Sequence, residues 1–404
     1  MKILHIADLH FGKSLSGLSL LEDQRDWAEK FVDLVKREKP AAVVIAGDVY
    51  DRGAPGEDAV ALLDEFLTGI LAADDQVNVL MVAGNHDSGP KLSFGAQIFR
   101  KQRLHIAGQV KAVMDRVILE DEFGPVTFWL LPYTFPAAIQ HVLADESLRD
   151  YTSAIKALLD RQIINPTERN VLVAHQNVLF DGTEAVVGGS ETMIGGVGGV
   201  DGTVFAAFDY VALGHIHRAQ RIGRETMRYA GSPLCYHFDE VRWGRKGAVC
   251  IDLKGKGNVA VSLENILPLH PLREIKGTFE DILAMEKANP ADGEYLKVVV
   301  TDRRINPIDA DTLRALFTAK GSILLELQSD YVEFTAGGEA ADEREHERTL
   351  NEKFVSFWKA RHHGMDPDAE TLALIRYAAE LADAAQGTSD EDAEKLVKFA
   401  VEGS

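Results

Sequence analysis

The chain has 404 residues, of which 46% are hydrophobic and 26% are charged, and its formal net charge is −20 at pH 7. This length exceeds that of an ordinary single domain, so we expect two or three domains, with ample apolar content for a core. The acidic charge argues against a free-standing nucleic-acid binder, because phosphate contacts require clustered Lys and Arg. If the substrate is DNA, metals and a local basic lip, or a partner protein, must attract it.

The sequence offers no sign of secretion or of a membrane anchor. Two cysteines, Cys235 and Cys250, cannot form a disulfide framework and lack zinc-binding spacing, so we expect both to pack as small apolar residues. The apolar run at residues 3–7 is too short for a signal-peptide core and is interpreted as the first strand. No apolar run approaches the length of a membrane span, so the expected location is the cytoplasm.

Strand and helix patterns alternate through the first 110 residues. Apolar residues at helical spacing predict helices over residues 20–39 and 59–72, and short apolar runs around them predict buried strands. This βαβαβ order implies parallel strands with helices packed on the sheet.

The next part of the chain predicts a second sheet. β-Branched residues gather over residues 110–131, which favours antiparallel strands, and a helix near residues 147–159 precedes the strand that leads to His175. Short strands with turns follow His217, and we assign them to the second sheet: residues 218–222, 227–230 and 248–253. The predicted fold class is therefore α/β, a two-sheet sandwich flanked by helices over residues 1–265.

The pattern changes near residues 265–271. Strand, helix, strand, helix and strand are predicted in turn within residues 270–335, which indicates a small α/β capping domain. A polar linker then precedes two amphipathic helices within residues 346–385, and residues 386–404 form an acidic tail. The linker favours docking of this helix pair on a partner over packing of the two helices only on each other.

Metal-binding side chains follow the predicted strands of both sheets. In chain order they are Asp8, His10, Asp48, Asn85, His175, His215 and His217. Sites in α/β layers are built at the carboxyl ends of strands. The two oxygens of Asp48 can bridge two ions about 3.5–4 Å apart, and Asn85 adds a neutral amide oxygen. Carboxylates, an amide and imidazoles together suit two adjacent divalent cations.

Each of these residues alone has a more ordinary explanation. A lone histidine is more often a core or surface residue than a ligand, Asp48 could cap a turn or helix, and Asn85 could form an Asx turn. Chance is a poor explanation for the occurrence of all these motifs together at strand ends: D-x-H, G-D-x-x-D, G-N-H-D, H and G-H-x-H. The sequence therefore predicts a two-metal phosphoesterase.

The series resembles the calcineurin-like metallophosphoesterase superfamily. Flanking segments narrow the resemblance to its nuclease branch, the bacterial SbcD family that partners the SbcC ATPase. These segments are HIADLHFGKSLSGLSLLEDQ (5–24), IAGDVYDRGAP (45–55), GNHDSGPKLSFG (84–95), LHIAG (104–108), FDYVALGHIHRAQRIG (208–223) and YAGSPLCYHFDE (229–240). The resemblance covers residues 1–265 well, and the later segments are similar in layout only.

The resemblance implies a DNA exonuclease and endonuclease that uses two Mn²⁺ ions, with Mg²⁺ as the alternative, on double-strand breaks and hairpins. The implied ligands are Asp8, His10, Asp48 and His217 for one ion, and Asp48, Asn85, His175 and His215 for the other. His86 would stabilise the transition state or protonate the leaving 3′-oxygen, and Asp87 would orient its imidazole.

The resemblance also implies partners. The helix pair would dock on the coiled-coil base of an SbcC-type, SMC-like ATPase, in a heterotetramer that contains a homodimer of this chain. The capping domain would steer double-stranded DNA ends and hairpins. Four basic residues beside the ligand blocks could face DNA phosphates, although each is equally explained as a solvated surface charge: Lys13, Arg52, Lys91 and Arg218.

Three positions depart from the family pattern. Asp51 stands where archaeal and eukaryotic relatives have a second catalytic histidine, Gln176 where many have glycine, and Cys235 where many have a lysine suited to phosphate contact. Two other functions fit the motifs: a phosphoesterase for small phosphodiesters or phosphoproteins, and a non-catalytic scaffold. The long extension after residue 265 weighs against the first, and the intact ligand series weighs against the second.

Overall fold

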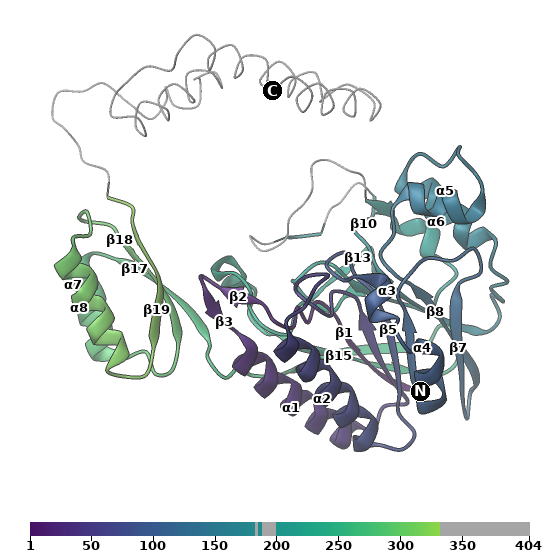
Figure 1. Cartoon of the computed structure of the whole chain (residues 1–404), viewed down its shortest axis with the longest axis horizontal. Coiled ribbons are helices and arrows are strands. Elements are labelled where there is room, and N and C mark those ends of the chain that lie inside the picture. The colour runs from purple at the N-terminus through teal and green to yellow at the C-terminus, as the bar shows by residue number, and fades with distance from the viewer. Residues whose placement is uncertain (182–184, 188–198, 332–404) are drawn as a thin grey trace, which may run out of the picture. The chain divides into compact units, whose positions relative to one another are not determined.

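The computed structural model describes residues 1–181, 185–187 and 199–331 (Figure 1). Residues 1–331 form one compact unit. The helix pair predicted at residues 346–385 and the acidic tail at residues 386–404 lie outside the described residues. None of the described helices combines the length and the apolar character that a membrane span requires.

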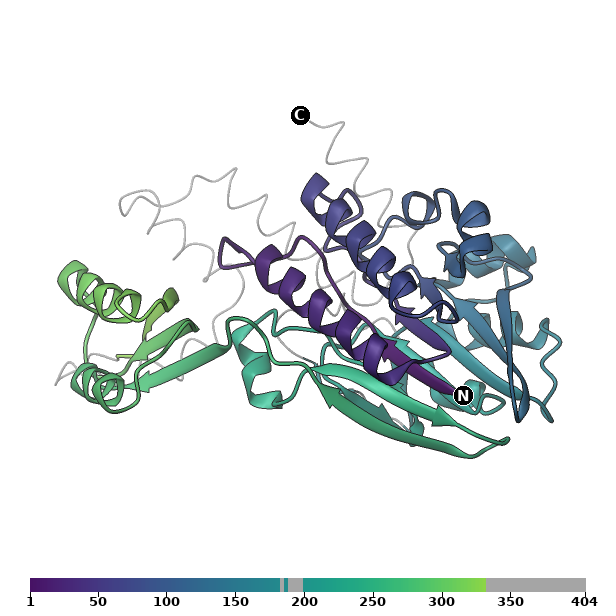
Figure 2. The same ribbon diagram turned by 90° about the horizontal axis from the view of Figure 1, so that it is seen from below.

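The first sheet is built around parallel strands with buried residues. Its order is β16-β15-β1-β4-β5-β6, and β1, β4, β5 and β6 run parallel to one another. The bounds are β1 Lys2–Ile6, β4 Ala42–Ala46, β5 Asn78–Val82, β6 Leu104–Ala107, β15 Gly247–Leu253 and β16 Val259–Asn265. Helices α1 (Leu21–Glu38) and α2 (Glu57–Ala73) lie side by side (Figure 2). They bury Trp27, Phe31 and Phe66 in the core that they share with this sheet.

The second sheet has the order β13-β14-β12-β9-β8-β7. Its bounds are β7 Asp115–Asp121, β8 Gly124–Leu131, β9 Arg169–His175, β12 Tyr210–Gly214, β13 Gln220–Ile222 and β14 Arg224–Tyr229. Strands β8, β9, β12 and β14 run parallel, and β7 and β13 are antiparallel at the edges. Helices α5 (Pro136–Leu143) and α6 (Tyr151–Asp160) share a core with this sheet.

Side-chain alternation joins the two sheets into a sandwich. On β4, Val43 and Ile45 face the core under α1 and α2, whereas Val44 packs with Val171 and Val173 of the second sheet. Residues two apart on a strand share a face, so each central strand buries both of its faces. The predicted two-sheet sandwich flanked by helices is confirmed.

One strand lies in a different sheet from the predicted one. The sequence assigns residues 248–253 to the second sheet, but they form β15, which runs antiparallel to β1 in the first sheet. Ala248 faces the helix-covered core, and Val249 and Ile251 face the core between the sheets. Such a pattern reports burial on both faces, which either sheet provides, so periodicity alone could not assign the strand.

Short strands and short helices lie in the connections between the longer elements. They are β2 Ser14–Leu15, β3 Leu18–Ser19, α3 Gly89–Leu92, α4 Ala96–Phe99, η1 Arg100–Gln102, β10 Val178–Leu179, β11 Val200–Asp201, η2 Gly202–Phe205 and η3 Phe238–Trp243. Helix α6 begins later than the predicted residue 147, because Asp150 caps it by accepting the N–H of Ser153.

The described part ends with a three-stranded parallel sheet that has its own core. Strand, helix, strand, helix and strand occur in the predicted order: β17 Leu272–Gly277, α7 Phe279–Ala288, β18 Tyr295–Val300, α8 Pro307–Thr318 and β19 Ile323–Ser329. Buried Asp23 of α1 accepts a hydrogen bond from the Tyr295 hydroxyl at 3.0 Å and another from the His270 N–H at 3.0 Å. A buried carboxylate thus joins this segment to the helix that covers the first sheet.

Candidate metal centre

The predicted ligands meet where the carboxyl ends of strands from both sheets come together. Asp8, His10, Asp48 and His215 follow their strands with positive φ angles of 54°, 45°, 48° and 104°. Residues other than glycine rarely adopt a positive φ angle, because this backbone conformation is strained. The strain persists only where the surrounding structure imposes it. The backbone turns therefore aim the side chains of these residues into one place.

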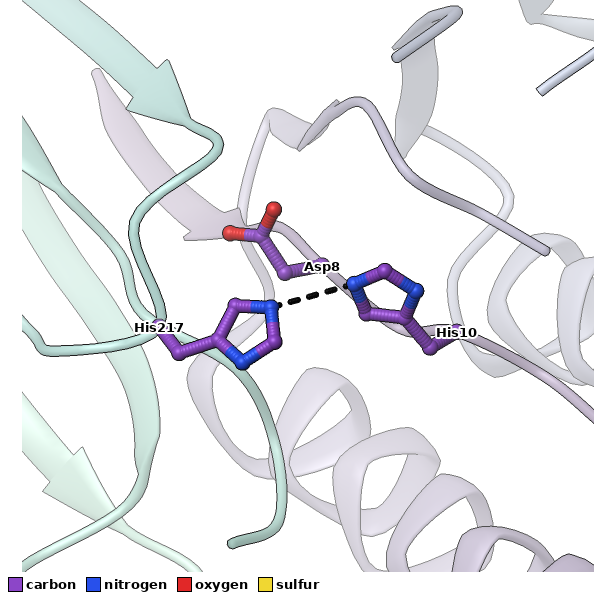
Figure 3. Close-up of side chains that lie close together, drawn as sticks. All are labelled: Asp8, His10 and His217. Atoms are coloured by element: carbon purple, nitrogen blue, oxygen red, sulfur yellow. Dashed lines mark hydrogen bonds between the residues drawn. The ribbon is translucent and has the colours of Figure 1, made fainter. Parts of the chain in front are cut away.

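One group contains Asp8, His10 and His217, which we call the Asp8 site (Figure 3). All three side chains are buried, and the Nε2 atoms of His10 and His217 lie 3.1 Å apart. Two ligands each about 2.1 Å from one ion are separated by about 3.0–3.4 Å, so these nitrogens fit a shared cation. Within the described residues, the buried Asp8 Oδ2 has no hydrogen-bond partner, which also suits a metal ligand.

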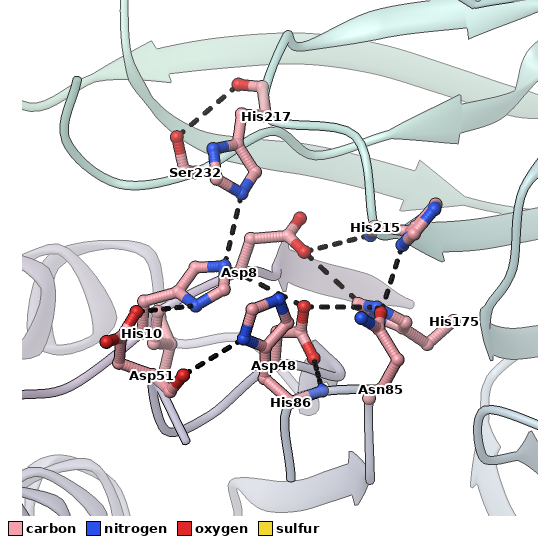
Figure 4. A network of polar contacts seen from close by, with 12 residues as sticks. Asp8, His10, Asp48, Asp51, Asn85, His86, His175, His215, His217 and Ser232 are labelled. Carbon is pink, nitrogen blue, oxygen red and sulfur yellow. Dashed lines mark hydrogen bonds and ion pairs between the residues drawn. The ribbon is translucent and has the colours of Figure 1, made fainter. Parts of the chain in front are cut away.

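A second group contains Asn85, His175 and His215, which we call the Asn85 site (Figure 4). The Asn85 Oδ1 atom lies 2.9 Å from His175 Nε2 and 3.1 Å from His215 Nδ1. Asp48 Oδ2 lies 3.3 Å from His175 Nε2 and 3.7 Å from His10 Nε2, so this oxygen faces both sites. The structure therefore brings all seven predicted ligand residues together, with Asp48 between the two groups.

Two glycines allow this close approach. A Cβ atom on Gly47 would lie 2.3 Å from His175 Nδ1, and a Cβ on Gly84 would lie 2.1 Å from Asp48 Oδ1. Neither distance can accommodate a side chain, and Gly47 also has a φ of +88°. Packing across the centre thus requires both glycines, and the local turn also requires Gly47.

Hydrogen bonds outside the centre fix the orientation of two imidazoles. His175 Nδ1 lies 2.8 Å from the Ala46 carbonyl oxygen, and His217 Nδ1 lies 3.2 Å from Glu240 Oε1. Both partners accept hydrogen bonds, so each Nδ1 donates and each Nε2 keeps a lone pair for the centre. Glu240 was not among the predicted site residues, because nothing in the spacing of the segment at residues 229–240 links it to His217.

His86 lies beside the centre and is held by a main-chain atom. Its Nδ1 is 2.9 Å from the Asp51 carbonyl oxygen, and its ring centre is 4.8 Å from that of His10. His86 also lies close enough to His10 and Asp48 to join them as a third ligand of one ion. Geometry alone therefore permits either a catalytic or a ligating role for this imidazole.

Asp87 makes different contacts from those expected. The resemblance implies that it orients His86, but its carboxylate accepts the N–H groups of Gly84, Val49 and Tyr50 at 2.9, 3.1 and 2.9 Å. The Asp51 carbonyl oxygen holds His86 instead. Asp87 thus joins the loop after β4 to the loop after β5, because its oxygens are directed at backbone donors.

The electrostatics of the centre favour added positive charge. Burial, reinforced by the charge of Asp48, raises the pKa of Asp8 from 3.8 to about 6, although nearby histidines oppose this change. Burial also acts to raise the pKa of Asp48, but the imidazoles of His175 and His10 hold it below its usual range. Two buried carboxylates at this spacing are stabilised by cations, and divalent metal ions supply the largest local positive charge.

The centre is open on one side. Asn85 is exposed, and His86 and His215 are half-buried, so a substrate can reach this edge. The four basic residues predicted to contact DNA phosphates differ in exposure and in the contacts that their side chains already make. Lys13 Nζ is bound to Asp51 Oδ1 at 2.7 Å, and exposed Lys91 donates to the Gly53 carbonyl. The remaining two are the exposed Arg52 and the half-buried Arg218.

Comparison with known proteins decides the family. The model of the calcineurin-like phosphoesterase family matches residues 1–219. The D subunit of the SbcCD nuclease of Staphylococcus epidermidis is 34% identical over 288 residues, which is 70% of this chain and 74% of that protein. The chain belongs to the calcineurin-like phosphoesterases, in the branch of the SbcCD nucleases. It is a metal-dependent phosphodiesterase of the nuclease type, as the resemblance implies, and the alternative functions are not favoured.

The chain is also similar to a second relative, to a model of a C-terminal domain and to solved structures. The equivalent nuclease component of Staphylococcus saprophyticus is 33% identical over 70% of this chain and 73% of its own length. Residues 268–362 match the model of the type 5 capsule protein repressor C-terminal domain. Among solved structures, a dimetal phosphatase from Danio rerio shares 16% identity over 65% of this chain and 98% of its own, with a TM-score of 0.35. GAP50 of Plasmodium shares 11% identity over 84% and 99%, with a TM-score of 0.36.

Asp8→Asn is expected to raise the melting temperature of the metal-free protein in EDTA at pH 7. The asparagine is neutral, and its Oδ1 can still accept the His215 N–H that Asp8 accepts at 2.9 Å. Because the folded-state pKa is raised from 3.8 to about 6, wild-type Asp8 destabilises the fold fully above pH 6 and not at all below pH 3.8. The difference should therefore shrink between pH 7 and pH 4.

Differential scanning fluorimetry measures this effect, with the exposed Asp292→Asn as the control. At saturating Mn²⁺, the wild type should have a higher melting temperature than Asp8→Asn. Ligand at about 100 times its Kd stabilises the wild type by about 2.7 kcal/mol, and a variant without the Asp8 carboxylate loses part of this gain. A stability gain in EDTA that is the same at pH 7 and pH 4 would contradict the assigned cause.

Proposed function

We propose that this chain is the Mn²⁺-dependent DNA nuclease component of an SbcCD-type complex that processes double-strand breaks and hairpins. Its ligands would be Asp8, His10, Asp48 and His217 for one ion, and Asp48, Asn85, His175 and His215 for the other. The observation that carries the proposal is Asp48 Oδ2, which faces a histidine nitrogen of each site at 3.3 and 3.7 Å. Mg²⁺ is the alternative metal, since hard oxygen ligands suit both ions.

The protein groups have distinct roles in this mechanism. Bound cations would activate a water molecule and neutralise charge on the phosphate. His86, at the open edge, would stabilise the transition state or protonate the leaving 3′-oxygen through Nε2. Its Nδ1–H is donated to the Asp51 carbonyl, so Nε2 has a proton to give only when the ring is an imidazolium with both nitrogens protonated. Asp87 would hold the loop that carries Asp48 against the loop that carries His86 through its three hydrogen bonds to backbone N–H groups. Arg52, Lys91, Lys13 and Arg218 would contact DNA phosphates, and of these Arg52 and Lys91 are exposed.

The partner in this proposal is an SMC-like ATPase of the SbcC type. The matched relatives are named as D subunits of the SbcCD nuclease. A net charge of −20 also disfavours tight DNA binding by the isolated chain, because few counterions can be released from the DNA. The partner would supply the basic surface, residues 346–385 would dock on it, and the segment at residues 270–335 would steer the DNA end.

A second copy of this chain would complete the complex as a homodimer. Phe94 is 84% exposed, Ile98 is 71% exposed and Val60 is 46% exposed. Val60, Phe94 and Phe99 line an apolar groove of about 620 Å³ beside the loop that carries Asn85 and His86. Exposed apolar residues that gather in this way mark interaction surfaces, so we assign this surface to the dimer contact.

His86→Ala is predicted to keep both bound ions while turnover falls by about 10²–10⁴-fold, the range for general acid–base groups. His215→Ala should instead lose metal together with activity. Metal content after gel filtration and the rate of DNA hydrolysis, measured on the same samples, separate the two results. The surface variant His141→Ala is the matched control. Loss of metal in His86→Ala would make this histidine a ligand, and full activity in His215→Ala would refute the ligand assignment.

Deletion of residues 346–385 is predicted to abolish co-purification with the ATPase. Hydrolysis of a small ester such as bis(nitrophenyl) phosphate should be unchanged, because the described centre lies within residues 8–217 and the supporting Glu240 also remains. Co-expression with affinity capture of the ATPase measures assembly. If the truncated chain still assembles, docking belongs to another segment, with residues 270–335 as the next candidate.

Phe94→Glu combined with Ile98→Glu is predicted to convert the dimer into a monomer, because both charges would be buried at the proposed contact. Sedimentation velocity at several protein concentrations measures the change. Ile163→Glu is the control, since Ile163 is 88% exposed and lies in the loop after α6. A dimer that persists in the double variant would contradict this contact, and dissociation in the control would place the contact at the loop after α6.

A further inference from the structure

A buried ion pair lies directly behind His217. Glu240 of η3 is fully buried, and its Oε2 accepts a hydrogen bond from Lys246 Nζ at 2.7 Å. Lys246 is 8% exposed and also donates to the His217 carbonyl oxygen at 2.9 Å and to Ser232 Oγ at 2.7 Å. The other oxygen of Glu240 accepts from His217 Nδ1 at 3.2 Å. One carboxylate therefore receives hydrogen bonds from an ammonium group and from an imidazole of the Asp8 site.

The charge state of this network follows from its contacts. Lys246 and His217 both donate hydrogen bonds to Glu240, and these contacts stabilise its carboxylate form. Burying two opposite charges seldom stabilises a fold more than apolar side chains of the same size would, so stability alone gives a weak reason for this pair.

The two sites differ in how their histidines are supported. At the Asn85 site, His175 Nδ1 faces the neutral carbonyl of Ala46. At the Asp8 site, His217 Nδ1 faces the charged Glu240. A carboxylate behind a ligating histidine fixes the ring and makes the ligating nitrogen more basic, and removing such a group lowers metal affinity by about 10–100-fold. The structure thus supplies a carboxylate support to one site and a main-chain support to the other.

We infer that Glu240 is a positioning residue that sets the metal affinity of the Asp8 site through His217, with Lys246 as its charge partner. This inference rests on the proposed function, because it takes His217 as a ligand. It adds that the two sites have unequal dependence on this network. Loss of Glu240 should weaken one bound ion and leave the other unchanged, which a general loss of folding would not do.

Two matched double variants test the inference: Glu240→Gln with Lys246→Met, and Glu240→Leu with Lys246→Met. Both remove the two charges together, so neither leaves one buried charge without its partner. They differ in one feature, since Gln offers an amide oxygen that can accept from His217 Nδ1 and Leu offers none. Melting temperatures in EDTA report the stability of each fold, and Mn²⁺ titration calorimetry with electron paramagnetic resonance reports each site.

We expect the Leu variant to weaken one of two Mn²⁺ sites by about 10–100-fold, the Gln variant to weaken the same site less, and the other site to be unchanged. In a His217→Ala background, the Glu240 substitutions should leave the remaining site unaffected, because coupling requires the shared imidazole. Wild-type affinity at both sites in either folded variant would overturn the inference, as would equal weakening of both sites. If the Leu variant does not fold, the Gln variant alone decides.

Failure of the proposed function gives a different result. A wild-type protein that binds no Mn²⁺, or a His217→Ala variant that still binds two ions with unchanged affinity, would refute the ligand assignment and this inference with it. Two ions in the wild type, one in His217→Ala and no effect of Glu240 substitution would leave the proposed function in place and refute only the role of Glu240.

Discussion

The contact between the carboxyl ends of the two sheets governs the rest of this structure. Hydrogen bonds cross that seam: His175 Nδ1 donates to the Ala46 carbonyl, and the His215 N–H donates to Asp8 Oδ1. Each joins a residue at the end of a strand in one sheet to a residue of the other. Since the inter-sheet core fixes how closely the sheets approach, it also fixes the spacing of the ligands.

The buried charged side chains that suit the centre to bind metal also destabilise the fold when no cation is bound. The centre places two carboxylates and several imidazoles in buried positions, and burial, reinforced by the charge of Asp48, raises the pKa of Asp8. Such a cluster destabilises a protein that lacks a compensating charge. Cations that neutralise the cluster therefore stabilise the fold as well as supply the chemistry. Metal binding and folding are coupled in this chain through the same residues.

The ligands could be predicted from the sequence because each lies at the end of a buried strand or a few residues beyond it. Asp48 after residues 42–46 and His175 at the end of β9 are examples, and the strand and its ligand share one local pattern. Features that depend on distant partners could not be predicted. The assignment of β15 to a sheet depends on β1, with which it pairs in the register Leu4 to Cys250. The contact of Glu240 with His217 depends on where η3 packs in the folded chain.

The hold on His86 comes from a main-chain oxygen, and this has a consequence for substitutions at position 51. The Asp51 side chain pairs with Lys13, whereas its carbonyl engages the imidazole, so the two contacts are independent. Any residue with the same backbone conformation at position 51 would present the same carbonyl. A change of side chain at position 51 would therefore remove the contact with Lys13 and keep the contact that holds His86, so the identity of the residue does not record that contact.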